Sequence, residues 1–510
     1  MNSSSISRGG GWWGYPKAAW LVIGVEASER FSFYGVLSLL VLFLTGSTAH
    51  GGFGWTAADA LTLLGAYSGA MYAFPALGGY VADRVLGRRR AVGLGLGFTL
   101  LGQILLLSPV FLPALCAALH KAPLLESLRT LGAPLGYLRP PPAVAAAIEH
   151  AGATLDAAHG VSWLRDAYAL GAAGFYAAMF FLVLGNALMK ASLVVLCGDT
   201  FPPDDVRRES AYAYYYLGIA LGAVTAGIVV GGVAELFGWY CGFMTGLAGI
   251  LIACSAYAVL ARRWLPIDVR ADSPVRQASI PQPGTLIPPQ EDSRPMQRIG
   301  LLGILALLLC IFSTGWFQLF GTWSLFIGTF VKRSWGTFVI PVPWFGSLDA
   351  AAAIVFAPLL AEIWVRLAVR ETAIDIVQKY VFAFAMAALA HLLMFLCARG
   401  ATASAPGSVW LPTVAVILLA VGELVAWTST YAVVSRAAPI GLASMTMGLW
   451  YMLTLGLGGY FSGFAGHVVT ALGFADTFGV VALAMGAAAL GTLSLRRTIF
   501  RMAGRAGIGL

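Results

Sequence analysis

Apolar segments long enough to cross a lipid bilayer recur along almost the whole sequence. A helix needs about 20 mostly apolar residues to span the hydrocarbon core of a membrane. Such segments lie at about residues 18–46, 57–82, 91–115, 168–197, 211–234, 239–262, 299–330, 349–365, 376–398, 408–436, 441–464 and 473–495. This pattern predicts an all-α polytopic membrane protein with twelve transmembrane helices.

The composition excludes an ordinary soluble protein. Hydrophobic residues make up 59% of the 510 residues and charged residues only 11%, which is too little charge to cover a soluble surface of this size. The net charge of +8 comes from arginines at the ends of the apolar segments. That distribution follows the positive-inside rule, so we expect contact with the lipid bilayer and no nucleic-acid partner.

The arginine-rich connections also predict the orientation. They lie between predicted helices 2 and 3, 4 and 5, and 8 and 9, and in the central linker and the C-terminal tail. All of them fall on the same side as the N-terminus, so both termini should be cytoplasmic in a multi-pass protein of the cell inner membrane. The first apolar segment contains Glu26, Glu29 and Arg30, which a cleavable signal peptide would not carry.

Two long connections divide the sequence. Residues 264–298 are rich in Pro, Ser, Asp and Arg and predict a cytoplasmic linker between an N-terminal six-helix half (1–263) and a C-terminal one (299–510). Residues 116–167 predict an extracytoplasmic loop. Asp83 and Glu362 each close a predicted helix just before an arginine cluster, and such equivalent loops are typical of a duplicated transporter.

Five charges fall inside predicted membrane helices, where they are costly and therefore candidates for function. Glu26, Glu29 and Arg30 share one face of the first helix because of their spacing. Lys190 lies in the fourth helix, which runs the opposite way, and should reach the carboxylates of the first. Glu423 lies near the middle of the tenth. A central cavity lined by these groups would bind protons and an anion, although structural ion pairs between helices would also explain them.

Other chemistry has no support in the sequence. No Lys follows a Gly, so the phosphate-binding motif GxxxxGK[ST] is absent. The six cysteines show neither CxxC nor metal-ligand spacing. No nucleophile and base stand out as a pair. We therefore expect no enzyme activity, no metal and no cofactor other than a proton as coupling ion.

Several segments resemble the signatures of one transporter family. They are EASERFSFYG at 26–35, GGYVADRVLGRRR at 78–90, GNALMK at 185–190, GDTFPPDD at 198–205, PVPWFGSLD at 341–349 and SMTMGLWYM at 444–452. The chain resembles the proton-dependent oligopeptide transporters of the major facilitator superfamily over nearly its whole length. The resemblance implies the major facilitator fold, with two six-helix halves, and a symporter that imports di- and tripeptides by alternating access. We expect it to be a monomer.

The resemblance also implies roles for individual residues. Proton coupling would use Glu26, Glu29, Arg30 and Lys190. Arg30 and Lys190 would attract the peptide carboxylate, and Glu423 would hold its amino group. Other expected substrate-binding residues are Tyr34, Tyr72, Gln318, Asp349 and Trp450. Asp83, Arg84 and Arg88 would form a cytoplasmic gate loop.

The sequence departs from this family at important positions. Phe317 precedes Gln318 where the family has an acid tied to proton coupling, and Asp349 stands where it has Asn, so Asp349 could partly replace that acid. These changes support an alternative, in which the same scaffold carries another small peptide-like or anionic solute with weakened or absent proton coupling. A sensor or an assembly subunit that does not transport is a third hypothesis, against which the complete set of five charges argues.

Overall fold

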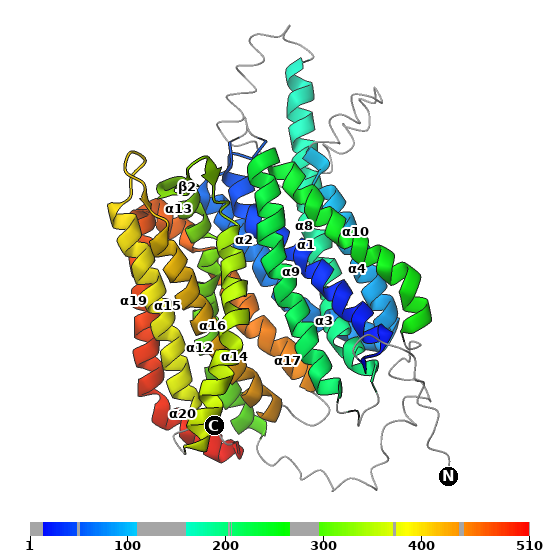
Figure 1. Ribbon diagram of the computed structural model, residues 1–510, viewed down its shortest axis with the longest axis vertical. Coiled ribbons are helices and arrows are strands. Elements are labelled where there is room, and N and C mark those ends of the chain that lie inside the picture. Colours follow the sequence, from blue (N-terminus) through cyan, green and yellow to red (C-terminus); the bar gives the residue numbers. More distant parts are fainter. Residues whose placement is uncertain are drawn as a thin grey trace.

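The computed structural model describes residues 14–47, 51–109, 160–201, 205, 207–265, 295–370, 374–437 and 443–508. Two groups of long helices lie side by side in it, the first from the N-terminal part of the chain and the second from the C-terminal part (Figure 1). Most of the predicted loop 116–167 and of the linker 264–298 lies outside the described residues.

The first group begins with a long central helix. Its members are α1 (Lys17–Thr45), α2 (Ala57–Ala73), α3 (Pro75–Val81), the π-helical turn η3 (Ala82–Leu86), α4 (Arg88–Leu105), α8 (Gly160–Asp199), α9 (Arg207–Phe237) and α10 (Trp239–Trp264). The chain breaks between α2 and α3 at Phe74 because Pro75 cannot continue the backbone hydrogen bonding of α2.

The second group contains more interruptions. Its helices are α12 (Pro295–Trp316), η4 (Phe317–Leu319), α13 (Thr322–Phe330), α14 (Trp344–Val369), α15 (Ile376–Gly400), α16 (Trp410–Ala437), α17 (Ala443–Tyr451), η5 (Met452–Gly456), α18 (Leu457–Ser462), α19 (Ala465–Ser494) and α20 (Arg496–Ala506). Its short strands are β1 (Val331–Lys332), β2 (Ser334–Trp335), β3 (Phe338–Val339) and β4 (Gly407–Ser408). β1 pairs with β4 in parallel, and β2 pairs with β3 antiparallel.

The prediction of an all-α polytopic membrane protein is confirmed. Ten helices among the described residues are long and apolar enough to cross a membrane. The other two predicted spans, 91–115 and 441–464, correspond to α4 and to the consecutive segments α17, η5 and α18. α4 begins with three arginines, which lower its mean hydropathy, and the other stretch is divided by a π-helical segment.

Some predicted boundaries were wrong. α8 begins at Gly160, so the end of the predicted loop 116–167 is helical. The predicted span 299–330 corresponds to one candidate membrane span, Met296–Phe330, inside which the 3-10 turn η4 separates α12 from α13. Gly473 has φ of 83° inside α19, a value that glycine adopts without strain. Gly473 therefore marks a kink that divides α19 into two helical segments.

The basic residues gather at one end of the bundle, which we call the arginine-rich face. It contains the start of α1 and of α4, the ends of α10 and α14, and α20, with the residues Lys17, Arg88, Arg89, Arg90, Arg262, Arg263, Arg366, Arg496, Arg497, Arg501 and Arg505. The start of α1 and the helix α20 lie at the same end (Figure 1). At this end Arg496 donates to Asp375 over 2.7 Å, which ties α20 to the start of α15.

Glycines bring the two groups into close contact toward the opposite end. Gly463 follows the end of α18 and faces α2. A methyl group added at Gly463 would lie 2.8 Å from the carbonyl oxygen of Leu61 and 3.2 Å from Cα of Gly65, both in α2. On α9, a methyl group at Gly227 would lie 2.4 Å from the carbonyl oxygen of Pro343. Small residues allow helix backbones to approach in this way.

Candidate transport site

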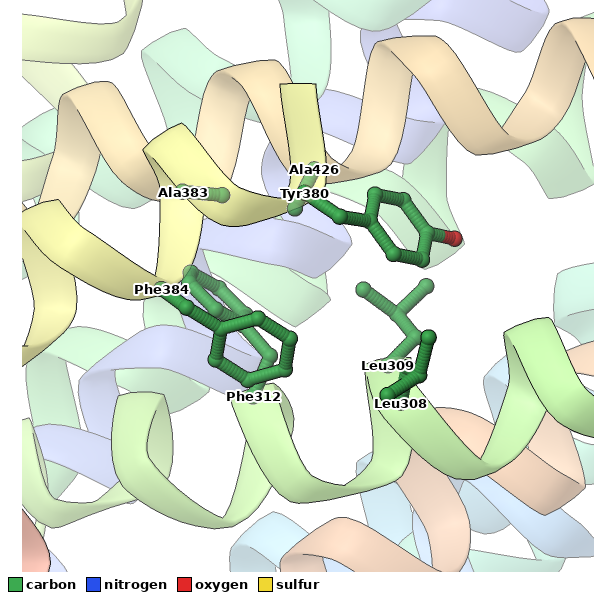
Figure 2. A pocket seen from close by; sticks show the side chains of 7 residues that line it. All are labelled: Leu308, Leu309, Phe312, Tyr380, Ala383, Phe384 and Ala426. Atoms are coloured by element: carbon green, nitrogen blue, oxygen red, sulfur yellow. The ribbon is translucent and has the colours of Figure 1, made fainter. Parts of the chain in front are cut away.

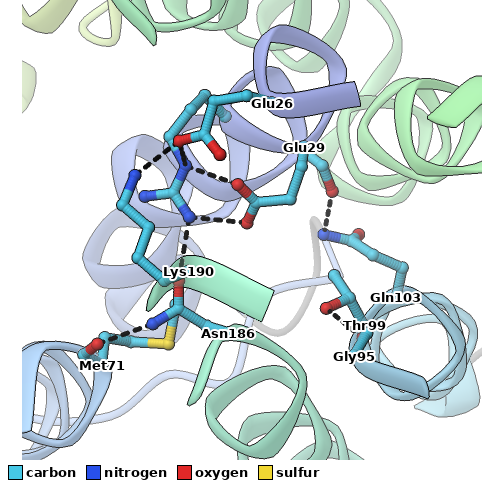
Figure 3. A network of polar contacts seen from close by, with 10 residues as sticks. Glu26, Glu29, Met71, Gly95, Thr99, Gln103, Asn186 and Lys190 are labelled. Carbon is cyan, nitrogen blue, oxygen red and sulfur yellow. Dashed lines mark hydrogen bonds and ion pairs between the residues drawn. The ribbon is translucent and has the colours of Figure 1, made fainter. Parts of the chain in front are cut away.

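α1 is apolar on nearly all sides and is buried, so its charged residues must find partners inside the protein. Arg30 donates to both oxygens of Glu29, over 2.5 Å from Nε and 2.7 Å from Nη2. The carboxylate of Glu26 lies 3.6 Å from Nε of Arg30. Glu26 also accepts a hydrogen bond from Nζ of Lys190 over 2.5 Å, across the interface of α1 with α8 (Figure 3).

The four charges differ in their access to solvent. Glu26, Glu29 and Arg30 are 0%, 1% and 2% exposed, whereas the side chain of Lys190 is 25% exposed. Glu29 is held by the bidentate contact with Arg30, and Glu26 lies between two cations. Lys190 is therefore the most exposed of the four charges in this network.

The sequence analysis missed Asn186 in this network. Arg30 donates from Nη2 to Oδ1 of Asn186 over 2.9 Å, and Asn186 donates from Nδ2 to the carbonyl oxygen of Met71 over 2.6 Å (Figure 3). Asn186 thus joins α1, α2 and α8. A signal was present, because Asn186 precedes Lys190 by one helical turn in an apolar helix.

We expect Asn186→Leu to lower the stability of the protein. The change leaves a guanidinium N–H and the carbonyl oxygen of Met71 without a partner in a buried place, and lost hydrogen bonds to charged groups cost about 1.5–3 kcal/mol. Thermal unfolding in detergent measures the effect. Ser192→Ala on the same helix is the control, since the hydroxyl of Ser192 donates to the carbonyl oxygen of Leu188 within its own helix. Equal melting temperatures for the two variants would contradict this role.

A second cluster lies in the C-terminal group of helices. Asp349 of α14 and Glu423 of α16 interact with each other, and both interact with the indole of Trp316 on α12. Asp349 is 4% exposed and its Oδ1 has no hydrogen-bond partner. Among the described residues, neither acid forms an ion pair.

Tyrosines connect the two clusters. Tyr34 of α1 and Tyr72 of α2 interact with each other, and both interact with Arg30. Both tyrosines also interact with Glu423. Tyr216 of α9 was not among the expected site residues, and it interacts with both acids of the second cluster. The structure therefore brings Arg30, Tyr34, Tyr72, Asp349 and Glu423 to one central region.

Two other expected substrate-binding residues, Gln318 and Trp450, are both buried. Gln318 lies in η4, where its amide donates to the carbonyl oxygens of Thr314 and Ser462 and accepts from Thr322. Its polar atoms thus have partners inside the second helix group. Trp450 is buried in α17, 3% exposed, and its Nε1 has no hydrogen-bond partner.

Phe317 is the apolar residue at the position where the resembled family has an acid. It is 1% exposed, and its ring centroid lies 4.9 Å from that of Trp316 and 6.1 Å from that of Tyr72. Its neighbours are aromatic rings that connect the tyrosines to the indole beside the acid pair. No charge can be supplied from this position.

The expected gate loop lies at the arginine-rich face. Arg88, at the start of α4, donates to Asp83 of η3 over 3.1 Å and to Asp199 at the end of α8 over 2.7 Å. Arg84 lies in the same π-helical turn as Asp83. The sequence analysis missed Asp199. A search of the neighbouring connection for an acidic partner of Arg88 would have suggested it.

The connection from α8 to α9 carries a further ion pair on this face. Arg207 donates hydrogen bonds to the carboxylate of Asp205, which hold the pKa of Asp205 well below its usual value, at about 2. Arg207 also donates to the carbonyl oxygen of Gly14 over 2.6 Å. This contact ties the connection to the chain just before α1.

In the part of the chain that the structure describes, no metal site is evident. Within the described ranges, no group of three or more His, Cys, Asp or Glu side chains could hold a metal ion. A cavity among α12, α15 and α16 is lined by Leu308, Leu309, Phe312, Tyr380, Ala383, Phe384 and Ala426 (Figure 2). The hydroxyl of Tyr380 is bonded to Thr430 over 2.5 Å, so this space offers no free group for a charged solute.

A membrane-spanning helical fold with buried charges at its centre is typical of a membrane transporter. The chain belongs to the POT family. The model of that family matches residues 142–280 and 286–481, which are more than half of the sequence.

Relatives and solved structures agree with this assignment. The chain is 24% identical to the peptide transporter YePEPT of Yersinia enterocolitica, over 92% of this chain and 91% of that one. It is 22% identical to the uncharacterized transporter YclF of Bacillus subtilis, over 87% and 86%. The crystal structure of a peptide transporter POT in complex with sulfate matches with a TM-score of 0.76 and 19% identity, over 97% of both chains. A POT family transporter in complex with 5-aminolevulinic acid matches with a TM-score of 0.74 and 17% identity, over 96% and 98%.

Proposed function

We propose that this protein imports di- and tripeptides together with protons by alternating access, as a monomer in the cell inner membrane. The observation that carries the proposal is the placement of opposite charges around one central region. Lys190 and Arg30 lie in the first helix group, and Glu423 and Asp349 lie in the second. A zwitterion with a carboxylate at one end and an ammonium at the other suits this arrangement. Peptide transporters among the relatives support it.

The coupling step would act on the pair of Glu26 and Lys190. A proton that enters from outside and binds Glu26 removes its negative charge, so Lys190 becomes free to bind the peptide carboxylate. When the peptide leaves on the inside, Lys190 pairs with Glu26 again and the proton is released there. Such a charge change biases the equilibrium between outward-facing and inward-facing states. The proton is the coupling ion, and no other cofactor is needed.

The orientation follows from the arginine-rich face. We place this face in the cytoplasm, because positively charged connections are retained there. Asp83, Arg84 and Arg88 would then form the cytoplasmic gate loop. The link from Arg88 to both Asp83 and Asp199 would have to rearrange when the inner side opens.

Uptake of dialanine into proteoliposomes tests the proposal directly. We expect accumulation when a proton gradient is directed inward, and loss of that accumulation when an ionophore collapses the gradient. If the folded protein neither binds nor exchanges dialanine, peptide transport is excluded.

Phe317 favours one alternative. With an apolar side chain in the place of an acid, the same scaffold would carry another small peptide-like or anionic solute with little or no proton coupling. Exchange of dialanine without gradient-driven accumulation would support weakened coupling. Transport of a different solute and no binding of dialanine would support a changed substrate.

The amino-group role of Glu423 makes a separate prediction. We expect Glu423→Gln to weaken binding of free dialanine by about 30-fold or more, since removing one partner of a buried charge pair costs 2–5 kcal/mol and 1.4 kcal/mol corresponds to tenfold. N-acetyl-dialanine lacks the ammonium, so its affinity should change much less. Competition binding with both peptides measures the difference, and equal losses would refute the role.

A further inference from the structure

Asp349 and Glu423 form an acid pair that takes no part in the proposed coupling step. The two carboxyl groups interact directly, and in the described part of the chain no cation pairs with either one. Asp349 is buried with Oδ1 unpartnered, whereas Glu423 is partly exposed. The acid pair thus has an inner member and an outer member.

The neighbours of the acid pair that the structure describes are tyrosines and a tryptophan. Tyr216 from α9 interacts with both acids, and Tyr34 and Tyr72 from α1 and α2 interact with Glu423. The cation nearest to these tyrosines, Arg30, is bonded to Glu29. Among the described residues, the groups named here that face the pair from neighbouring helices are therefore neutral side chains.

Trp316 adds a geometric observation at the same place. Its indole is 5% exposed and its Nε1 has no hydrogen-bond partner, although it lies beside both acids. A buried donor and a buried acceptor oxygen that both lack partners mark a place where a ligand completes the hydrogen bonding.

Two neighbouring carboxyl groups repel each other when both are ionised, and the burial of Asp349 adds to the cost, so such a pair shares a proton. We propose that Asp349 and Glu423 form one amino-group site that holds a single proton, and that a second cationic group on the substrate replaces this proton. This inference rests on the proposed function, and it names peptides with a basic side chain as a substrate class that the site distinguishes.

The binding step balances for both kinds of peptide. A peptide with one ammonium group binds the carboxylate of Glu423, and the proton stays on Asp349. A lysyl peptide brings two ammonium groups. Its second ammonium takes the place of the proton on Asp349, and that proton passes to the solvent. No covalent bond forms or breaks apart from the transfer of this proton.

Three peptides and the pH dependence of their affinities test the inference. Lysyl-alanine carries two ammonium groups, Nε-acetyl-lysyl-alanine has the same shape with one, and dialanine is the small reference. Between about pH 5.5 and 7 the ammonium groups of these peptides stay largely protonated. We expect the affinity of lysyl-alanine relative to the acetylated peptide to rise by up to about tenfold per pH unit, because one proton is displaced. Titration of Glu26 or Glu29 affects both peptides equally and cancels in this ratio.

Variants assign the effect to the acid pair. In Asp349→Asn the ratio should no longer depend on pH, and lysyl-alanine should lose about tenfold more affinity than the acetylated peptide. Asp349→Glu keeps an acid and should keep the pH dependence, so the test does not depend on folding of the Asn variant alone. A ratio that does not change with pH in the natural protein, or equal losses of both peptides in Asp349→Asn, would overturn the inference. If dialanine binds but the affinity ratio of lysyl-alanine to the acetylated peptide does not change with pH, the inference is overturned and peptide transport stands. If none of the three peptides binds, both the inference and the proposed function are excluded.

Discussion

Glu26→Gln should abolish proton-driven accumulation of dialanine while exchange of peptide across the membrane continues. The substitution keeps the shape of the side chain and mimics its protonated form, so Lys190, now 2.5 Å from Glu26, stays free in every state. The protein would then bind peptide, but no proton would bind residue 26 on the outside and leave it on the inside. One coupled proton supports up to about tenfold accumulation for each unit of pH gradient, and this ratio should fall to one.

The measurement compares uphill uptake with counterflow in the same proteoliposomes. Glu362→Gln is the matched control, because Glu362 is paired with Arg366 on an exposed turn of α14 at 2.7 Å. Such a surface pair contributes little, and we expect both activities to be retained. Accumulation that persists in Glu26→Gln would show that the proton binds elsewhere, with Glu29 and Asp349 as the next residues to replace.

Gly463→Val should stop transport in either direction. Even a methyl group at this position would lie 2.8 Å from the carbonyl oxygen of Leu61, so the larger side chain forces α18 away from α2. Overpacking of this kind typically costs 1–3 kcal/mol. The overpacking destabilises the state in which α2 and α18 are in contact. A transporter that cannot close at this end cannot complete its cycle.

Counterflow of dialanine measures the effect, and we expect a loss of tenfold or more, since about 1.4 kcal/mol corresponds to tenfold. Gly486→Val on α19 is the control, because a Cβ at Gly486 meets no atom within 4 Å. Thermal unfolding separates a blocked cycle from a protein that does not fold. Normal counterflow in Gly463→Val would mean that the contact of α2 with α18 does not close during transport.

The membrane fold and the four charges of the first helix group were accessible from the sequence. Transfer of apolar residues from water into lipid depends on local composition, so the segments could be located one at a time. The spacing of Glu26, Glu29 and Arg30 was enough to place them on one face of a helix, and the opposite direction of the fourth helix was enough to expect Lys190 near them.

The central site could not be completed in this way. Asp349 and Glu423 lie on different helices, and their contact depends on how α14 and α16 pack. Gln318 was expected in the site, but the turn η4 directs its amide to Ser462 and Thr322. Asn186 and Tyr216 looked like ordinary polar residues of apolar helices until their neighbours were known.

Local chemistry thus determined which segments enter the membrane, which residues bring charge into it and which family the chain resembles. Tertiary structure alone decided that Lys190 pairs with Glu26 and not with Glu29, that two acids meet without a cation, and that glycines join the two helix groups at one end. The physical reason is the distance along the chain over which each effect is decided. Burial of a segment in lipid is a property of neighbouring residues in the chain, whereas the partner of a buried charge is set by helices that are distant in sequence and adjacent in space.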